Sequence, residues 1–176
     1  MQMFLPRLVF LSWFLNPCPC GYYGDKSKEC SCSPVQIQRY LRRLSGPLLD
    51  RIDMHVEITR VEFSDLEKAE PGEASALIKE RVEKARAIQR QRFANSKPTV
   101  TCNAQMPASL VRKHCRATSE AKALLKTAFK QLNLSARSHD KLLKVARTIA
   151  DLAGSDSIEA SHMAEALQYR SLENMW

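Results

Sequence analysis

The chain has 176 residues, of which 44% are hydrophobic, enough for one domain or two small ones with a buried core. Its net charge of +8 suits a polyanionic partner such as nucleic acid or a nucleotide phosphate, although charge bears on association and not on fold. Only 7% of the residues are aromatic and five are glycines, which argues against an all-β or low-complexity protein.

An apolar run from Met3 to Leu15 comes first in the chain. It has a weak polar start, no small-x-small cleavage site and an interruption at Arg7, so an export signal is disfavoured. The run is also too short to span a bilayer. We predict a buried strand that ends at Asn16-Pro17, in a cytoplasmic protein with no membrane partner. In that compartment the six cysteines are thiols or metal ligands rather than disulfides.

Two C-x-C pairs lie in the loop that follows this run. Nine residues separate Cys18 and Cys20 from Cys30 and Cys32. Four thiolates on one loop can close a tetrahedral zinc site, although the usual ligand pair has two to four intervening residues. The alternatives are four reduced cysteines without a metal, and a redox switch in which the C-x-C pairs form strained disulfides. The sequence leaves these three interpretations open.

A short basic helix is expected next, from Val35 to Leu44, and a turn at Ser45-Gly46-Pro47 follows it. Residues 52–58 then alternate apolar and polar side chains, which is the period-two pattern of a half-buried strand. A linker rich in acidic residues and a basic helix from Ala74 to Phe93 fill residues 61–106. For that helix, a solvated charged face is a better explanation than a DNA-reading surface.

Arg51 stands at the start of the alternating run, between Asp50 and Asp53. Arginine keeps its charge at any working pH and presents a rigid fork of donors that matches a phosphate. An arginine oriented by two aspartates at the end of an element is therefore suited to stabilising the transition state of phosphate transfer. The simpler interpretation is a surface salt bridge.

Residues 107–176 are predicted to form a small helical bundle, because apolar residues recur there at helical spacing. Helices are expected to start at Ser119, at Ser135 or Ser138, and at Ser161. Gly154 is expected to end the longest of them. We expect this bundle to fold independently and residues 1–60 to be poorly stable alone.

The chain contains three long motifs: Asn16-Pro17-Cys18-Pro19-Cys20-Gly21, the nine residues from Ser45 to Asp53, and Leu134-Ser135-Ala136-Arg137 followed by Val145–Leu152. Through these motifs the chain resembles the C-terminal part of the magnesium-chelatase-like AAA+ ATPases of the ComM/YifB type, over roughly residues 16–173. The resemblance implies an α/β remnant of an AAA+ P-loop core with the cysteine-rich loop in residues 1–60. Residues 61–106 would connect it to a mainly α-helical lid in residues 107–176.

The resemblance also implies a role for three residues. Asn16 is similar to the sensor 1 residue that orients the attacking water near the γ-phosphate. Arg51 is similar to the arginine finger that reaches ATP on the neighbouring subunit, and Arg137 to the sensor 2 arginine that touches the nucleotide in cis. The implied cofactor is ATP with Mg. The implied partners are a homo-oligomeric ring, expected to be a hexamer, and DNA, on which the family is thought to act as a branch-migration motor in recombination and natural transformation.

One departure from the family pattern is that the chain contains no G-x-x-x-x-G-K-[ST] loop and no apolar strand ending in paired acids. Without these phosphate- and metal-holding parts, we expect a partial subunit that is inactive alone, either a fragment or a chain that contributes only in trans. The alternative is a zinc-stabilised, basic nucleic-acid-binding module with no ATPase role, and a third possibility is a structural helical adaptor. Arg147 and Arg170 either pack the lid or face phosphate.

Overall fold

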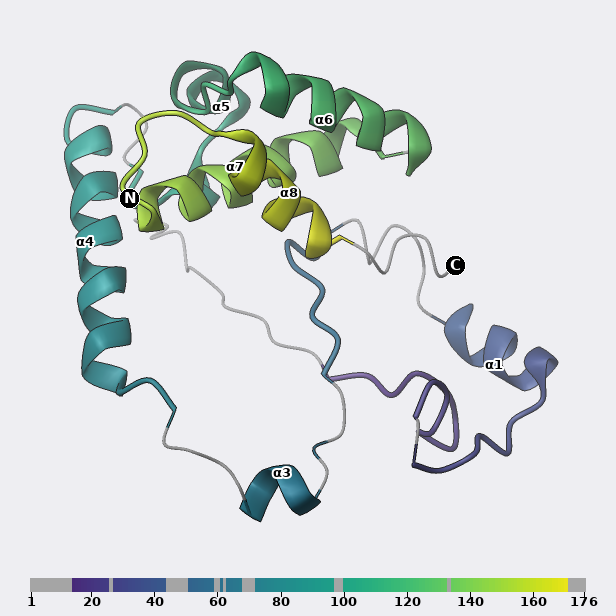
Figure 1. Ribbon diagram of the computed structural model, residues 1–176. Helices are drawn as coiled ribbons and strands as arrows, with labels where there is room; N and C mark the ends of the chain where they lie inside the picture. The colour runs from purple at the N-terminus through teal and green to yellow at the C-terminus, as the bar shows by residue number, and fades with distance from the viewer. Residues whose placement is uncertain are drawn as a thin grey trace, which may run out of the picture. The chain divides into compact units, whose positions relative to one another are not determined.

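The computed structural model divides into two compact units, Met1–Leu44 and Ser45–Trp176. The structure describes residues 14–25, 27–43, 51–58, 61, 63–67, 72–96, 100–132 and 134–170. The helices of each unit are drawn and labelled in Figure 1.

The first unit, in its described residues, is a cysteine-rich loop followed by helix α1 (Pro34–Leu41). A capping box at Ser33 starts the helix. The hydroxyl of Ser33 accepts from the N–H of Gln36 at 3.3 Å, and Gln36 Oε1 accepts from the N–H of Ser33 at 2.8 Å. Pro34 occupies the first helical position, where its missing N–H leaves no bond unmade.

α1 buries the apolar side that its sequence predicts. Ile37 and Leu41 lie against Cys18, which is completely buried, and Tyr40 packs beside them. The helix ends at Leu41, and the expected last residue, Leu44, lies outside the described residues. These few side chains are the core of the described part of this unit.

The second unit is helical in its regular structure, and α7 is its central helix. Its elements are α3 (Phe63–Glu67), α4 (Ser75–Phe93), the 3-10 turn η1 (Asn103–Gln105), α5 (Ala108–His114), α6 (Ser119–Gln131), α7 (Ala136–Leu152) and α8 (Ala160–Gln168). α7 packs against α4, η1, α5 and α8, and α8 also packs against α6. Figure 1 shows α6, α7 and α8 gathered in one bundle, with α4 running along its edge.

One apolar side of α7 is buried over most of its length. Leu142, Ala146 and Ala150 follow each other at four-residue spacing and are at most 1% exposed. The alanines carry no bulk, which lets neighbouring helices approach closely. The remaining buried members of this core are Phe93, Val100, Met106, Val111, Cys115, Ala121, Leu125, Leu134, Ile158, Met163 and Ala166. The bundle expected at 107–176 thus shares its core with residues that precede it.

The start of α6 differs by one residue from the prediction. Thr118 is the N-cap, and its hydroxyl accepts from the N–H of Ala121 at 3.2 Å. Ser119, the predicted cap, is instead the first helical residue, and its hydroxyl bonds Glu120. Both side chains offer the same chemistry, so sequence alone could not separate them.

The ends of α7 match the prediction, whereas the start of α8 does not. Ser135 caps α7 by accepting from the N–H of Ser138 at 3.1 Å, and Gly154, with φ of +69°, follows its end. α8 begins after Glu159, ahead of the predicted Ser161. The N–H of Glu159, the residue before the helix, donates to His162 Nδ1 at 3.1 Å. The hydroxyl of a serine cap would not bond this N–H.

The strand predicted at residues 52–58 is wrong. The segment is extended but pairs with no other strand in the described residues. Its alternation is also reversed, since Met54, Val56 and Ile58 are 45%, 63% and 80% exposed while His55 is buried. An alternating sequence forms a strand only where a neighbouring strand supplies ladder partners and a covered face.

The α/β character expected for residues 1–60 is not seen in the described part of the chain. Most of the run Met3 to Leu15, and the turn at 45–50, lie outside the described residues, while Phe14 and Leu15 are exposed and irregular. The isolated bridge that the described residues do contain joins Ala117 to Ile158. No helix among them is long and apolar enough to cross a membrane.

We predict that Thr118→Ala lowers the free energy of unfolding of the second unit by about 1 kcal/mol, because it removes the capping hydroxyl of α6. Ser119→Ala is the matched control and should change that free energy much less. Urea denaturation followed by circular dichroism measures both. Equal losses in the two variants would contradict the assignment of Thr118 as the cap.

Candidate functional site

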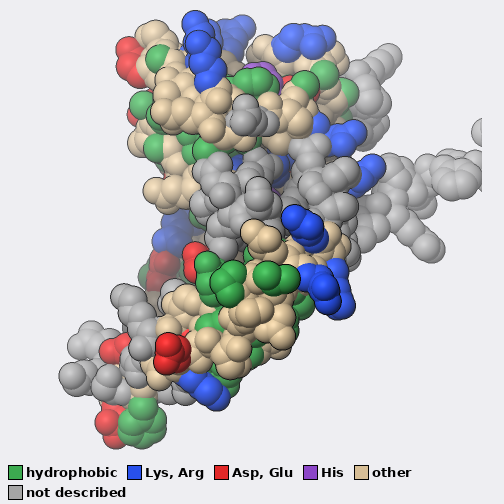
Figure 2. All heavy atoms as spheres, turned by 90° about the vertical axis from the view of Figure 1, so that its right-hand side faces the viewer, with side chains coloured by type: hydrophobic (Ala, Val, Ile, Leu, Met, Phe, Trp, Pro, Cys, Tyr) green, Lys and Arg blue, Asp and Glu red, His purple; other side chains and the backbone are tan. Residues whose placement is uncertain are grey.

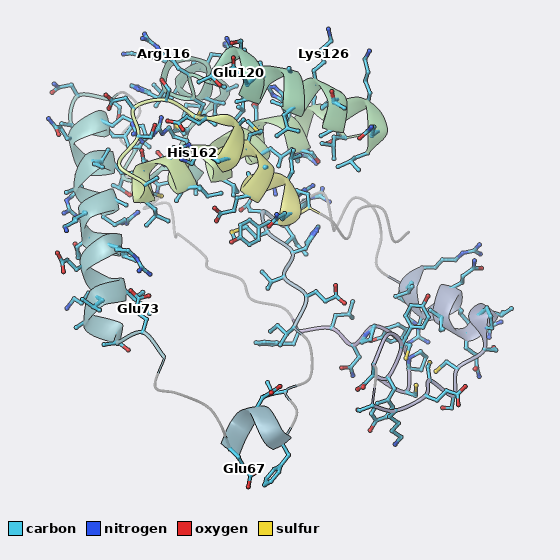
Figure 3. All side chains as sticks on the ribbon, in the orientation of Figure 1. Glu67, Glu73, Arg116, Glu120, Lys126 and His162 are labelled. Carbon is cyan, nitrogen blue, oxygen red and sulfur yellow. The ribbon has the colours of Figure 1, made fainter. Side chains whose placement is uncertain are left out.

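Four cysteines of the first unit come together in the loop before α1. The Sγ atoms of Cys18, Cys20, Cys30 and Cys32 all lie within 4.8 Å of one another. Cys18 Sγ is 3.3 Å from Cys20 Sγ and 3.7 Å from Cys30 Sγ, and the Cys20 and Cys30 sulfurs are 3.5 Å apart. Figure 3 draws the side chains of this loop beside α1. A cluster of this kind can hold a metal ion.

Glycines bend the chain so that the first cysteine pair faces inward. Gly21 has φ of +84°, and its N–H donates to the carbonyl of Cys18 at 3.0 Å, which closes a tight turn around Cys20. Gly24, also at φ of +84°, serves the next turn, where the N–H of Asp25 bonds the carbonyl of Tyr22 at 3.1 Å. Side chains with a Cβ rarely adopt this left-handed conformation.

The thiols of the cluster have different pKa values. A hydrogen bond from the backbone of Tyr22 is the largest reason that the pKa of Cys20 is lowered to about 5. A hydrogen bond from the backbone of Cys32 lowers the pKa of Cys30. Burial and the neighbouring Cys20 and Cys18 outweigh it and raise that pKa to about 12. Burial is the first cause of the raised pKa of Cys32. The sulfurs therefore repel additional negative charge, which a bound cation would offset.

Asn16, the expected sensor 1 residue, is exposed just before the cysteine loop. A Cβ built on Gly21 would lie 3.9 Å from Asn16 Cγ, so the side chain of Asn16 rests beside the turn that closes around Cys20. The position of Asn16 thus depends on the cysteine loop. Both belong to the first unit, whereas Arg51 and Arg137 belong to the second.

Arg51 begins a segment that is bound to the end of the helical bundle. Lys141 of α7 donates to the carbonyl of Arg51 and forms an ion pair with Asp53 at 2.9 Å. The N–H of His55 donates to the carbonyl of Tyr169 at 2.7 Å. We call residues 51–55 the strap. The side chain of Arg51 is exposed, while its main chain is fixed by these bonds.

Arg170 ties the strap to the first turn of α7. Its side chain is completely buried, and it donates to the carbonyl of Ile52 at 2.5 Å and to the hydroxyl of Ser138 at 2.8 Å. The sequence left open whether Arg170 packs the lid or faces phosphate. The structure assigns it to packing, because its side chain is buried and both of these hydrogen bonds are internal to the protein.

Arg137 lies in the first turn of α7, exposed to solvent and directly before Ser138. Lys141 is four residues later, on the same side of the helix. Arg170 joins Ser138, the residue after Arg137, to Ile52, the residue after Arg51. The strap that carries Arg51 is therefore bonded to the part of α7 that carries Arg137.

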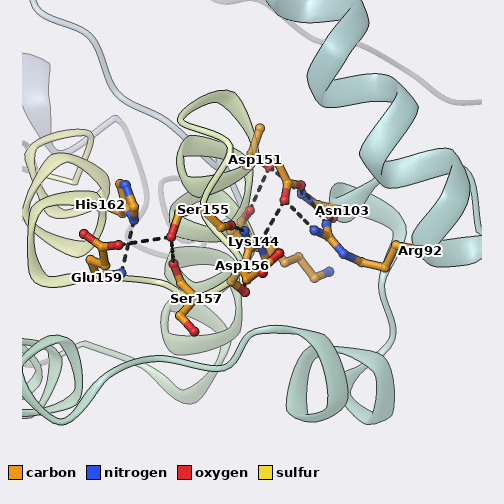
Figure 4. A network of polar contacts seen from close by, with 11 residues as sticks. Arg92, Asn103, Lys144, Asp151, Ser155, Asp156, Ser157, Glu159 and His162 are labelled. Atoms are coloured by element: carbon orange, nitrogen blue, oxygen red, sulfur yellow. Dashed lines mark hydrogen bonds and ion pairs between the residues drawn. The ribbon is translucent and has the colours of Figure 1, made fainter.

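A buried network of polar contacts, which the sequence did not predict, joins α4 and η1 to α7 (Figure 4). Asp151 Oδ2 accepts from Arg92 and from Asn103, both at 2.7 Å. Asp151 Oδ1 accepts from Arg147 Nε at 3.0 Å and pairs with the second Arg92 nitrogen. Arg147 also donates to the carbonyls of Asp156, at 2.8 Å, and Ser155. Arg147 is therefore a packing residue as well.

Only part of this network left a signal in the sequence. Arg147 and Asp151 are four residues apart within Val145–Leu152, the spacing of an ion pair on one helix face. Arg92 is 59 residues from Asp151, and nothing local links them. The motif that supports the family resemblance is thus a structural one: its polar members bind each other inside the bundle.

Basic side chains on α4 are largely matched by acids. Arg81 pairs with Glu73 at 2.5 Å, Lys84 with Glu80 at 2.7 Å, and Arg90 with Glu83 at 3.8 Å. On the face drawn in Figure 2, Lys and Arg side chains occur in several separate places. The prediction of a solvated charged face for this helix agrees with these exposed pairs.

Two family models match the chain, one over each of its two parts. A family model described as the C-terminal domain of magnesium chelatase subunit ChlI matches residues 72–170, and the model of magnesium chelatase subunit ChlI itself matches residues 3–66. The chain belongs to the magnesium chelatase ChlI-like family. The first match covers the whole described bundle, including α4 and the buried network, and the second contains both the cysteine cluster and the strap.

Among similar proteins are the competence protein ComM of Haemophilus influenzae, 38% identical over 159 residues, and YifB of Escherichia coli, 41% identical over 162 residues. An uncharacterised protein of Mycobacterium tuberculosis is 37% identical over 155 residues. These matches cover 90%, 92% and 88% of this chain, respectively, but only 30% of each relative. The chain is therefore similar to a part of the ComM/YifB proteins.

We predict that Asp151→Ala destabilises the second unit by about 3–5 kcal/mol, because it removes the carboxylate that pairs the buried Arg147 and the partly buried Arg92. Glu80→Ala, which breaks an exposed ion pair with Lys84, is the control and should leave stability unchanged. Urea denaturation at neutral pH measures the difference. Equal stabilities of the Asp151→Ala variant and the native chain would contradict the buried network.

The same network predicts a pH dependence. Burial alone raises the pKa of Asp151, but hydrogen bonds from Arg92 and Asn103 and the charge of Arg147 outweigh it, so the pKa lies below its ordinary value. A carboxyl with a lowered folded-state pKa contributes stability above its unfolded-state pKa of about 3.9 and loses that contribution as pH falls further. The stability gap between native chain and Asp151→Ala should therefore narrow below about pH 4. A gap independent of pH would contradict this.

Proposed function

We propose that this chain supplies nucleotide-sensing parts of a cytoplasmic AAA+ ATPase subunit that acts on DNA. In this proposal residues 1–60 contribute to the α/β core, residues 61–106 connect, and residues 107–176 are the helical lid. The observation that carries it is the strap: its bonds to Lys141 and Arg170 fix the main chain of Arg51 while the side chain of Arg51 stays exposed. An exposed guanidinium on a fixed main chain suits a phosphate that another subunit presents.

The proposed roles follow the chemistry of each group. Arg51 acts as arginine finger on ATP of a neighbouring subunit, where its charge stabilises the transferring phosphoryl group. Arg137 acts as sensor 2, and Asn16 as the sensor 1 residue that orients water. Mg-ATP is bound by the complete protein within a homo-oligomeric ring, proposed to be a hexamer. Because the chain has no G-x-x-x-x-G-K-[ST] loop, we propose that it does not hydrolyse ATP alone.

DNA is the proposed substrate of the assembled ring, in recombination and natural transformation. Two observations support this choice: the net charge of +8, and the similarity to a protein named for competence. A branch-migration motor is the form of activity that the family resemblance favours.

A chimera tests the proposed role of the arginines. The part of Haemophilus ComM that matches this chain is replaced by this chain, and ATP turnover of the assembled ring is measured with and without branched DNA. We predict that Arg51→Ala lowers kcat by about 10³-fold or more, because an arginine finger supplies that much transition-state stabilisation. Arg137→Ala should also lower turnover.

Arg112→Ala serves as the control, since this exposed arginine lies on α5, away from the strap contacts. Its turnover should equal that of the unmodified chimera. Unchanged turnover in both the Arg51→Ala and Arg137→Ala rings would contradict the proposal and favour the structural adaptor.

A second candidate function is a zinc-stabilised, basic nucleic-acid-binding module without an ATPase role. The four-cysteine cluster is compatible with it, whereas three of the exposed cations of α4 are paired with acids. This module would bind DNA with a steep salt dependence that neither nucleotide nor Arg51→Ala changes. For the proposed motor, both nucleotide and Arg51→Ala should change DNA binding.

A further inference from the structure

The described part of the first unit has only a small apolar core. The buried side chains of residues 14–43 are those of Cys18, Ile37 and Leu41, with Tyr40 and the other three cysteines packed around them. Chains below about 40 residues generally need disulfides, a metal or oligomerisation to stay folded. All six cysteines are free thiols, so disulfides do not supply the constraint in this structure.

The sulfur geometry is that of a metal cage. Four thiolates around Zn²⁺ at about 2.3 Å, in a tetrahedron, lie about 3.8 Å from one another. Three of the Sγ–Sγ separations are 3.3, 3.5 and 3.7 Å, and no pair exceeds 4.8 Å. A small outward shift of the sulfurs would therefore admit the ion without rearranging the loop.

The two arms of the cage are built differently, and each is anchored. Cys18 and Cys20 flank the turn closed by the Gly21 N–H, which bonds the Cys18 carbonyl at 3.0 Å. Cys30 and Cys32 lead directly into the capping box at Ser33, which fixes the start of α1. α1 then lays Ile37 and Leu41 over Cys18. One side of the cluster is thereby covered with apolar groups.

The type and number of the ligands indicate which ion binds and what role it has. Soft thiolates favour Zn²⁺ over Mg²⁺ or Ca²⁺, which prefer oxygen ligands. Four protein ligands fill a tetrahedral shell and leave no position for a substrate, which is the arrangement of a structural site. We propose that Cys18, Cys20, Cys30 and Cys32 bind one structural Zn²⁺ ion, and that this ion, rather than the apolar core, holds residues 14–43 in their fold.

A consequence concerns Asn16, two residues before Cys18. Its side chain lies beside Gly21, in the turn that follows the first two ligands. The ion would therefore hold the loop against which Asn16 lies. The sensing role of Asn16 rests on the proposed function, but the metal site does not, so each can fail without the other.

The experiment measures metal in the full chain purified without chelator. Zinc is quantified by inductively coupled plasma mass spectrometry, and thiols are counted after denaturation. We expect one zinc per chain in the native protein, and none in Cys18→Ser or Cys30→Ser. Cys102→Ser, which alters a cysteine outside the cluster, is the matched control and should retain its zinc. Replacement by Co²⁺ should give the intense visible absorption of a tetrahedral thiolate site.

Trypsin cleavage provides a readout that does not depend on how well the serine variants fold. Arg39, Arg42 and Arg43 lie in and after α1, within the proposed metal-dependent region. Adding a zinc chelator to the native chain should speed cleavage there at least about tenfold, leave α7 protected, and be reversed by zinc. Four free thiols without metal, a disulfide within the cluster, or cleavage unaffected by the chelator would each overturn the proposal.

Discussion

The buried guanidinium of Arg170 is the interaction on which the arrangement of the second unit most depends. A charge removed from water is costly unless it is bonded. Arg170 meets that requirement by donating to Ile52, 118 residues away in the chain, and to Ser138 in the first turn of α7. Releasing the strap would remove one of its acceptors. The position of the exposed Arg51 is thus set by a residue that never reaches solvent.

Asp151 applies the same constraint at the other end of α7. Its carboxylate is shared by Arg92, Asn103 and Arg147, so α4 and η1 cannot separate from α7 without stranding buried charge. Such networks add specificity more reliably than stability, because desolvation offsets much of the attraction. Together the two networks attach other elements to both ends of α7. The strap is bonded near the start of α7, and α4 near its end.

The sequence predicted the features that depend on local chemistry. The glycine end at Gly154 and the apolar side of α7 follow from local spacing, and the cap was predicted at Ser135 or Ser138, of which the structure selects Ser135. The strand at 52–58 failed because its ladder partner is a long-range property that alternation cannot reveal. The packing roles of Arg147 and Arg170 could not be predicted for a related reason. A buried arginine and a phosphate-facing arginine have the same appearance in the sequence until their acceptors are known. The paired C-x-C spacing permitted a metal site among three interpretations, and the fold brings the four sulfurs together.

The central claim of this account is that the strap is held against the bundle in solution. Amide hydrogen exchange of the full chain, read by NMR at the N–H of His55, tests it most directly, because that N–H donates to Tyr169 at the end of the bundle. The account predicts that His55 exchanges far more slowly than an unstructured peptide, and that Arg170→Leu removes this protection while Leu142 and Ala146 stay protected. Exchange of the His55 amide at the free-chain rate in the native protein would contradict it.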